Sequence, residues 1–304
     1  MPATDVTVRR ARSWEAHGVQ IGFHASHEQL APSALLAAVR HAEQAGFDAA
    51  MCSDHFSPWS ARQGESGYAW SWLGAALEAT STTLGVVTAP GQRYHPAIVA
   101  QAIATLGEMY PGRFWAALGS GEASNEHVTG DRWPSKPERD ARLLECAGDP
   151  CSPSGDEVSM RGYVVVDRAQ LWIVPPEPPL LFGAAVSAAT AATVGSWVDG
   201  LITVDQPSRC SQVIEAFGRC GGGDKPVAVQ VHVSWAPTEV EAEAIAPTSG
   251  AKRPPTGWPG TSNSCRSSTL WPYTLARRGA ASQERPIAGT PKTPLVRRWV
   301  VSPG

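Results

Sequence analysis

The chain has 304 residues, a net charge of −3 and 42% hydrophobic residues, which describes a globular protein with a sizeable core. No apolar run is long enough for a membrane-spanning helix. Residues 1–18 contain arginines without an apolar stretch behind them, which excludes a conventional signal peptide and favours the cytoplasm. The six cysteines show neither a CxxC pair nor zinc-ligand spacing, so they are predicted to be isolated thiols.

The charge is unevenly distributed along the chain. From Ala246 onward there are nine lysines or arginines against one acid, Glu284, so the preceding part carries a net charge of −11. A basic end of this kind is either an interaction tail or sequence that is foreign to the fold.

From Val19 onward, short apolar strands alternate with amphipathic helices. In chain order, beginning with a strand, they are expected at Val19–Phe23, Pro32–Ala45, Asp48–Cys52, Tyr68–Ala79, Thr83–Thr88, Pro96–Met109, Arg113–Leu118, Pro137–Cys146, Leu180–Ala184, Ser187–Trp197, Gly200–Val204, Ser208–Phe217 and Val227–Ser234. This alternation implies parallel strands and right-handed crossovers. An α/β fold of the (β/α)8 TIM-barrel type is the economical prediction, and a doubly wound open sheet is the alternative.

Two stretches interrupt the alternation. Residues 147–154 contain Pro150 and Pro153, which end any helix, and residues 246–304 contain nine prolines without an apolar period. We therefore expect an N-terminal extension at 1–18 and a barrel at 19–245 that is disrupted at 147–154. The Pro/Arg/Ser-rich tail at 246–304 is expected to be disordered and to leave the barrel incomplete at its C-terminal end.

Catalytic residues of a TIM barrel lie at the carboxyl ends of its strands, and several predicted strands are followed by polar side chains or glycines. These residues are His24, His27 and Glu28 after the first strand, Ser53, Asp54, His55 and Trp59 after the second, Gly119, Ser120, Gly121, Glu122, Asn125 and Glu126 after the fourth, and Ala184, Ala185, Val186 and Ser187 after the fifth. Acids, imidazoles and an indole are thus predicted to converge with a glycine loop on one mouth.

The segments SDHFSPW, RYHPAIVAQAIATL and ALGSGEASNE occur in this order, each after a strand. Together they resemble the luciferase-like monooxygenase superfamily, and most closely its branch of F420-dependent glucose-6-phosphate dehydrogenases and FMN-dependent relatives. The resemblance runs from about Val19 to Ile245. It implies a luciferase-like TIM barrel, coenzyme F420 or FMN as cofactor, and hydride transfer or monooxygenation on a small organic substrate.

The resemblance also implies catalytic roles. It places Asp54 and His55 at the redox face of the cofactor. His55 and Glu122 are the candidate proton donor and acceptor, because hydride transfer needs an acid or base within hydrogen-bond reach. Trp59, Glu122 and Glu28 would line the substrate side.

The residues that the resemblance assigns to cofactor binding are Asp54, Val86, Val87, Gly119, Ser120, Gly121, Asn125, Ala185, Val186 and Ser187. Val86 and Val87 correspond to a strained, non-prolyl cis peptide in this superfamily. The N–H groups from Ala185 to Ser187 would be offered to the cofactor phosphate.

Other interpretations of these residues stay open. Asp54 could cap a turn, His55 could be a core imidazole, and Glu122 could stabilise the start of a helix. GSGEAS lacks the third glycine of a dinucleotide fingerprint, and the HxxH of His24 and His27 is not the HxH of metal-dependent barrel hydrolases, so Rossmann and metal sites are disfavoured. A non-catalytic flavin- or deazaflavin-carrying protein and an inactive barrel remnant are the competing functional classes.

Departures from the family pattern limit the choice of substrate. Sugar-phosphate dehydrogenases of this family hold the substrate phosphate with lysines in the second half of the barrel, whereas only Lys136 and Lys225 precede the tail here. Glucose 6-phosphate is therefore unsupported, and the choice between FMN and F420 stays open. We expect a small-molecule substrate, neither nucleic acid nor a membrane as partner, and a homodimer as the assembly to test.

The two interruptions predict out-of-frame translation. A one-base shift within codons 148–154 permits Ile-Arg-Ala-Leu-Leu-Ala-Gly, which continues the preceding helix, and a shift at codons 247–251 permits Asp-Gln-Trp-Arg. Such a chain is expected to expose strand edges, to aggregate and to lack activity. The rival interpretation is a genuine basic tail that binds an anionic partner. Resequencing codons 146–156 and 244–250 tests the prediction, which fails if the written frame is confirmed and a monodisperse product binds cofactor.

Overall fold

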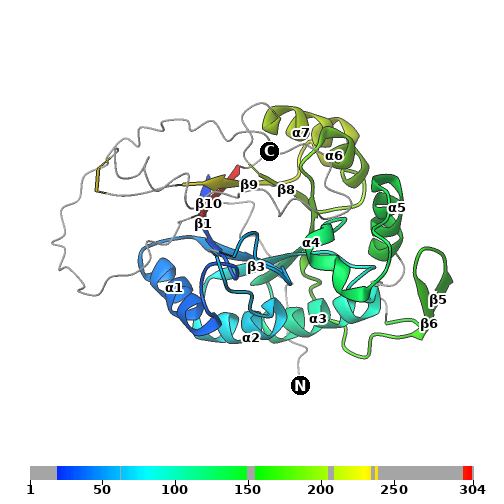
Figure 1. Ribbon diagram of the computed structural model, residues 1–304, viewed down its shortest axis with the longest axis horizontal. Coiled ribbons are helices and arrows are strands. Elements are labelled where there is room, and N and C mark those ends of the chain that lie inside the picture. The colour runs from blue at the N-terminus through cyan, green and yellow to red at the C-terminus, as the bar shows by residue number, and fades with distance from the viewer. Residues whose placement is uncertain are drawn as a thin grey trace, which may run out of the picture.

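The computed structural model describes residues 19–61, 63–148, 155–204, 209–233 and 237–238, and the backbone of 297–302. Figure 1 shows the arrangement of the elements. They are β1 (Gln20–Ala25), α1 (Pro32–Gln44), β2 (Ala49–Ser53), α2 (Ala69–Ala79), β3 (Thr83–Thr88), α3 (Pro96–Met109), β4 (Phe114–Leu118), α4 (Ala123–Glu126), η1 (His127–Thr129), α5 (Lys136–Ala147), β5 (Val158–Arg161), β6 (Val165–Ala169), β7 (Leu180–Ala184), α6 (Ala188–Val194), β8 (Gly200–Val204), α7 (Cys210–Phe217), η3 (Gly218–Gly222), β9 (Val227–His232) and β10 (Arg297–Ser302).

The main sheet closes into a barrel in the order β1-β10-β9-β8-β7-β4-β3-β2. All neighbouring strands other than β10 pair in parallel. The longer helices cover the outside of these strands (Figure 1), as right-handed crossovers require. This arrangement confirms the predicted α/β barrel. None of the helices in the described ranges is long and apolar enough to cross a bilayer.

The eighth position of the barrel is filled from the expected tail. β10 pairs antiparallel with β1 on one side and with β9 on the other. The eighth β/α unit of a complete TIM barrel is absent from the described residues, but the strand edges that an open barrel would expose are paired. Residues 149–154 and 239–296, on which most of the out-of-frame prediction and the expected disorder rest, lie outside the described residues.

A two-stranded antiparallel hairpin, β5–β6, follows α5 and lies beside the barrel (Figure 1). This hairpin was not predicted from the sequence. The Glu145 carboxylate in α5 accepts hydrogen bonds from the N–H groups of Tyr163 and Val164, at 3.0 and 2.7 Å. His95, which precedes α3, contacts the Val165 carbonyl through Nε2 at 2.9 Å. These contacts hold the hairpin to two helices of the barrel.

The barrel interior has its own hydrophobic cluster, made up of Ala49, Met51, Trp115, Ala117, Phe182, Ile202 and Ala228. Trp115 of β4 is the largest of these side chains, and it is almost completely buried. A Cβ atom at Gly85 of β3 would lie 2.0 Å from the Trp115 ring. The indole therefore takes the space that any side chain at position 85 would need.

The expected cis peptide at Val86–Val87 is wrong. No peptide bond among the described residues is cis, and β3 pairs in regular parallel register with both β2 and β4 through these two positions. Val86 is fully buried in the core between the sheet and the helices, away from the barrel interior. Val87 packs against the interior cluster.

Replacing Gly85 with alanine should destabilise the protein. The added methyl group would overlap the Trp115 ring, and overpacking of this kind costs about 1–3 kcal/mol. Gly74 is the matched control, because it lies within α2 and a Cβ there meets nothing within 4 Å. Gly74→Ala should leave the free energy of unfolding unchanged or raise it by up to about 1 kcal/mol. Urea unfolding of both variants checks this, and equal effects would contradict the role assigned to Trp115.

Candidate functional site

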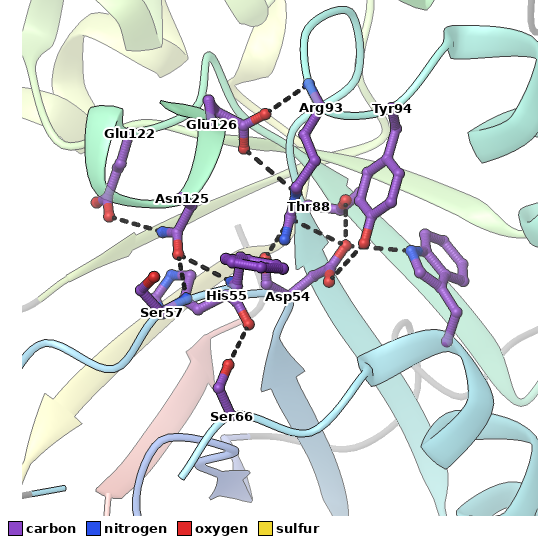
Figure 2. A network of polar contacts seen from close by, with 12 residues as sticks. Asp54, His55, Ser57, Ser66, Thr88, Arg93, Tyr94, Glu122, Asn125 and Glu126 are labelled. Carbon is purple, nitrogen blue, oxygen red and sulfur yellow. Dashed lines mark hydrogen bonds and ion pairs between the residues drawn. The ribbon is translucent and has the colours of Figure 1, made fainter. Parts of the chain in front are cut away.

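The loops that follow β1, β2, β3 and β4 meet at the carboxyl ends of their strands, and Figure 2 shows polar side chains from the ends of β2, β3 and β4 and the loops after them. The candidate site occupies this mouth of the barrel. Because the four strands pair in parallel, residues that follow each strand are brought to the same end of the sheet.

Asp54 is the most highly connected side chain of the mouth, and it is 4% exposed. Its backbone N–H donates to the Val87 carbonyl at 2.9 Å. Its carboxylate accepts hydrogen bonds from Trp70 Nε1 at 3.1 Å, Thr88 Oγ1 at 2.9 Å and Tyr94 OH at 3.1 Å. Asp54 therefore joins the end of β2 to α2, to β3 and to the loop after β3, and its carboxylate is occupied by protein donors.

Arg93 connects Asp54 to the loop after β4. Its Nη2 donates to the Asp54 carbonyl at 2.7 Å and lies 3.5 Å from the carboxylate. Its backbone N–H donates to Glu126 at 2.8 Å, and its guanidinium lies 3.7 Å from the same carboxylate. Burial raises the pKa of Glu126, and Arg93 opposes this shift. The buried guanidinium is thus shared by two acids.

Thr88, Arg93 and Tyr94 were not predicted as site residues. Arg93 and Tyr94 begin the segment RYHPAIVAQAIATL, but nothing in its residue types indicated which side chain meets Asp54. Burial raises the pKa of Tyr94, and the Asp54 charge adds to this shift, so the Tyr94 hydroxyl stays protonated as a donor.

His55 Nδ1 contacts Glu28 Oε1, and the contact is an ion pair when the imidazole is protonated. The Glu28 side chain is fully buried, whereas 17% of the His55 side chain is exposed. Burial alone would raise the pKa of Glu28. The effect of burial is outweighed by the hydrogen bond and charge of His55, the charge of His24 and the hydroxyl of Ser26. The pKa of Glu28 is therefore held well below its usual range. An ionised carboxylate therefore lies behind the His55 ring.

The backbone around His55 is held on both sides. Asn125 Oδ1 accepts from the N–H groups of Phe56 at 2.9 Å and Ser57 at 3.1 Å. Ser66 Oγ donates to the His55 carbonyl at 2.8 Å (Figure 2). The Trp59 ring meets the imidazole edge-to-face, with 5.2 Å between centroids. Asn125 thus positions the loop that carries His55.

Glu122 lies at the N-terminal end of α4 but makes no side-chain capping hydrogen bond. Asn125 Nδ2 donates to its carboxylate at 3.4 Å. The residue is exposed to solvent, although neighbouring protein atoms reduce the hydration of its carboxylate. Burial raises the pKa of Glu122, Glu28 raises it further, and His55 opposes the shift.

The loop after β4 presents backbone to the mouth. Gly121 has φ of 75°, a left-handed conformation that favours glycine. A Cβ there would lie 3.1 Å from Glu126 and 3.4 Å from Ala89. The Gly119 N–H donates to the Thr88 carbonyl at 2.9 Å, and a Cβ at 119 would lie 3.4 Å from Ala184. Gly119 and Gly121 contribute no side chain to the mouth, and the Glu126 side chain packs against Gly121.

The expectation for Ala185 is wrong in one respect. Its N–H donates to the Ile202 carbonyl at 3.0 Å, because the parallel pairing of β7 with β8 continues through this residue. This N–H is therefore not available to a phosphate. Val186 is 55% exposed, and Ser187 caps α6 by accepting from the Thr190 N–H at 3.3 Å.

Two further histidines lie beneath the mouth. His24 Nε2 contacts Ser53 Oγ at 3.1 Å, between neighbouring strands. His27 is completely buried and packs edge-to-face on Trp72, with 5.0 Å between centroids. Neither His27 nitrogen has a hydrogen-bond partner among the described residues. Burial lowers the pKa of His27 against the opposing charges of Glu28 and Asp54, so its ring is held neutral.

A hollow of about 210 Å³ lies on the protein surface away from the mouth. Its lining residues are Ala97, Ile98, Gln101, Ala104, Thr105, Asp156, Val158, Ala169, Gln170, Leu171, Trp172 and Ile173. The hollow brings no acid together with a base, and none of the predicted site residues lies in it. The mouth is therefore the candidate active site.

Removing the buried histidine should change the acid sensitivity of the fold. Because the folded-state pKa of His27 is lowered from 6.5, the unfolded chain takes up its proton first as the pH falls. The free energy of unfolding should then fall below pH 6.5, by at most about 1.4 kcal/mol per pH unit from this residue. His27→Phe should flatten that slope, whereas His41→Gln, an exposed change on α1, should not. Denaturation at pH 7.5, 6.0 and 5.0 checks this, and parallel slopes in wild type and His27→Phe would contradict it.

Comparison with known proteins places this geometry in a family. The family model described as luciferase-like monooxygenase matches residues 17–290. An F420-dependent glucose-6-phosphate dehydrogenase of Beutenbergia cavernae is 39% identical over 201 residues, covering 63% of this chain and 58% of that protein. An F420-dependent hydroxymycolic acid dehydrogenase of Mycobacterium tuberculosis is 37% identical over 201 residues, covering 65% and 56%. The chain thus spans less than two thirds of the length of these relatives.

Solved structures show the same likeness. An F420-dependent secondary alcohol dehydrogenase in complex with an F420–acetone adduct superposes with a TM-score of 0.63 at 36% identity, covering 67% of this chain and 66% of that one. A type II Baeyer–Villiger monooxygenase shares the fold, with a TM-score of 0.61 at 17% identity, covering 75% of this chain and 71% of that one. It is the oxygenating constituent of 3,6-diketocamphane monooxygenase from Pseudomonas putida, in complex with FMN. The family match extends over most of the chain, from the first strand into the tail, and the chain belongs to the luciferase-like monooxygenase family.

Proposed function

We propose that this protein is an oxidoreductase that binds F420 or FMN at the barrel mouth and exchanges a hydride with a small organic substrate. The observation that carries the proposal is the contact of His55 Nδ1 with the buried carboxylate of Glu28. A carboxylate behind an imidazole fixes the proton on the ring nitrogen that faces it and leaves the other nitrogen basic. His55 is thereby prepared as a general base at the open end of the barrel.

The two carboxyl groups near His55 have opposite electrostatic properties. The pKa of Glu28 is lowered, so Glu28 is ionised and stabilises a positive charge on His55. The pKa of Glu122 is raised by burial, so Glu122 retains a proton to a higher pH than an ordinary glutamate. Groups whose pKa values are driven apart in one site are typical of acid–base pairs. This supports His55 as the base and Glu122 as the acid.

Small residues on one side of the mouth support the binding of a flat ring. Ala89, Gly119, Gly121 and Ala184 lie close together, and Cβ atoms added at the two glycines would meet Ala89, Glu126 and Ala184. Residues without a long side chain let a planar group approach the backbone closely. Asp54 and Asn125 were expected to contact the cofactor. Their side-chain oxygens accept hydrogen bonds from protein groups instead, so we assign them the role of positioning the loop that carries His55.

A bound flavin or deazaflavin supplies the hydride acceptor or donor, which no side chain supplies. For oxidation of an alcohol, His55 accepts the hydroxyl proton through Nε2 as the hydride leaves the neighbouring carbon, and the carbonyl product forms. Glu28 stabilises the imidazolium. In the reverse direction the same nitrogen returns the proton to the carbonyl oxygen. Trp59, against the His55 ring, restricts the face from which a substrate can reach it.

Small secondary alcohols are the first substrates to assay, because the similar structure at 36% identity carries an F420–acetone adduct. If FMN is the cofactor, oxygen becomes a possible acceptor, as the name of the FMN-bound structural neighbour indicates for that protein. We further propose a cytoplasmic enzyme without nucleic-acid or membrane partners, with a homodimer as the assembly to test by light scattering.

Titration of the full chain with FMN and with F420, followed by fluorescence quenching, tests the proposal. Binding of one cofactor together with its reduction by an alcohol supports an enzyme. Binding without turnover over a wide alcohol panel would support a non-catalytic carrier. Binding of neither cofactor would favour an inactive barrel remnant and would remove the basis for the proposal.

His55→Ala should lower the turnover number by roughly 10²–10⁴, since this is the usual contribution of a general base. The dissociation constant of the cofactor should stay within a few-fold. Glu28→Gln should lower turnover in the same direction, because the amide cannot stabilise the imidazolium. His41→Ala on the exposed face of α1 is the control. Steady-state rates and cofactor titrations check this, and equal losses of binding and turnover would assign His55 a structural role.

A further inference from the structure

Ser26 and Glu28 lie in one turn that follows β1. The Gln29 N–H donates to the Ser26 carbonyl at 3.3 Å, which closes a turn of four residues. Within this turn the Ser26 hydroxyl donates to Glu28 Oε2. His27, which lies between them in the chain, packs instead against Trp72 of α2. The turn therefore brings a hydroxyl to the carboxylate that lies behind His55.

The two oxygens of the Glu28 carboxylate have different partners. Oε2 accepts from Ser26 Oγ, and Oε1 contacts His55 Nδ1. Ser26 is 4% exposed and Glu28 is fully buried, so bulk water is not available to replace the hydroxyl. Because a carboxylate is planar, a donor that holds Oε2 also sets the direction in which Oε1 points.

The ordinary role of a serine at the start of a turn does not account for Ser26. In that role the hydroxyl accepts a hydrogen bond from a backbone N–H a few residues further along the chain. Among the described residues, the one hydrogen bond of Ser26 Oγ is the one that it donates to Glu28. The hydroxyl thus serves the carboxylate and not the turn.

Ser26 differs from the other groups around Glu28 because it carries no charge. The titratable groups that face the contact between Glu28 and His55 are His24 of β1, His27 of the turn, Asp54 after β2 and Glu122 after β4. Burial raises the pKa of Glu28, and the Ser26 hydroxyl is among the groups that oppose this shift. Its removal therefore alters the carboxylate without changing the number of charges in the mouth.

We propose that Ser26 is a positioning residue for the hydride-transfer reaction, whose hydroxyl holds the Glu28 carboxylate toward His55 Nδ1 and thereby makes the other ring nitrogen a stronger base. A carboxylate at one imidazole nitrogen stabilises the imidazolium that forms when the other nitrogen takes a proton. Ser26 keeps its own proton throughout, and the substrate proton goes to His55 Nε2. The proposal rests on the proposed function, because His55 is the base assigned there.

Three substitutions at position 26 separate the hydroxyl from the space that it fills. Ser26→Ala removes the donor, Ser26→Cys keeps an atom there that donates only weakly, and Ser26→Thr keeps the hydroxyl. Ser81→Ala is the matched control. Ser81 Oγ also donates to a glutamate, Glu43 Oε1 at 2.7 Å, but it precedes β3 and so lies at the other end of the barrel from the mouth.

The titration of His55 is followed by NMR of the cofactor-free full chain, and its signal is the one that His55→Ala removes. In Ser26→Ala the midpoint should move to lower pH by roughly 0.5–1 unit, because a hydrogen bond to a charged acceptor is lost. Ser26→Cys should move it in the same direction, and Ser26→Thr should restore it. Ser81→Ala should leave it in place.

The same variants are compared in steady-state kinetics. The acidic limb of the pH profile of kcat/KM should move to lower pH with the His55 midpoint, since that limb reports deprotonation of the base in the free enzyme. At its plateau kcat should fall by roughly two- to ten-fold in Ser26→Ala, because a weaker base accepts the proton less readily. The dissociation constant of the cofactor should stay unchanged.

The Glu28→Gln background shows whether Ser26 acts through Glu28. There Ser26→Ala should hardly move the His55 midpoint, since the carboxylate that it holds is absent. An equal shift in both backgrounds, or no shift in either Ser26→Ala or Ser26→Cys, would overturn the positioning role alone. A shifted midpoint in a protein that oxidises no alcohol supports the contact between Ser26, Glu28 and His55, and in that case only the proposed function fails.

Discussion

The arrangement of the mouth depends on the buried carboxylate of Asp54. It accepts from Trp70 of α2, Thr88 of β3 and Tyr94 of the following loop. These groups come from separate segments, and each would leave an unpaired polar atom in the core if the carboxylate were missing, at a cost of about 1–3 kcal/mol per group. His55 is the next residue in the chain, so the position of Asp54 sets where the imidazole enters the mouth. The turn-cap interpretation of Asp54 understates this role.

Much of the fold could be predicted because its signals are local. Thr83–Thr88, Pro96–Met109, Leu180–Ala184 and Gly200–Val204 were predicted with the bounds that the structure has, since apolar period and Gly or Pro boundaries lie within each segment. β5–β6 was missed because its strands are only 4 and 5 residues long and largely exposed, so their apolar pattern does not stand out from that of a loop. The pairing of β10 depends on contacts with β1 and β9 far away in the sequence, which no local pattern encodes.

The candidate site was predictable only to the level of position. Residues that follow parallel strands must meet, so the approach of Glu28 to His55 follows from the barrel itself. Their partners do not follow from it. Arg93 is shared between Asp54 and Glu126 because the three side chains fit together in space, and sequence spacing carries no sign of that. The cis peptide expected by resemblance was wrong, since β3 keeps a regular parallel register with both of its neighbours.

The direction of β10 leaves the mouth with one loop fewer than a barrel of eight parallel strands would have. In the antiparallel pairings its first residue, Arg297, lies opposite His24 of β1 and His232 of β9, at the end of the barrel where the mouth lies. A parallel eighth strand would end at the mouth and send a loop across it, whereas β10 begins at that end and runs away from it. The described acid–base residues come from the loops after β1, β2 and β4, and Arg93 of the loop after β3 is the cation between two of the neighbouring acids.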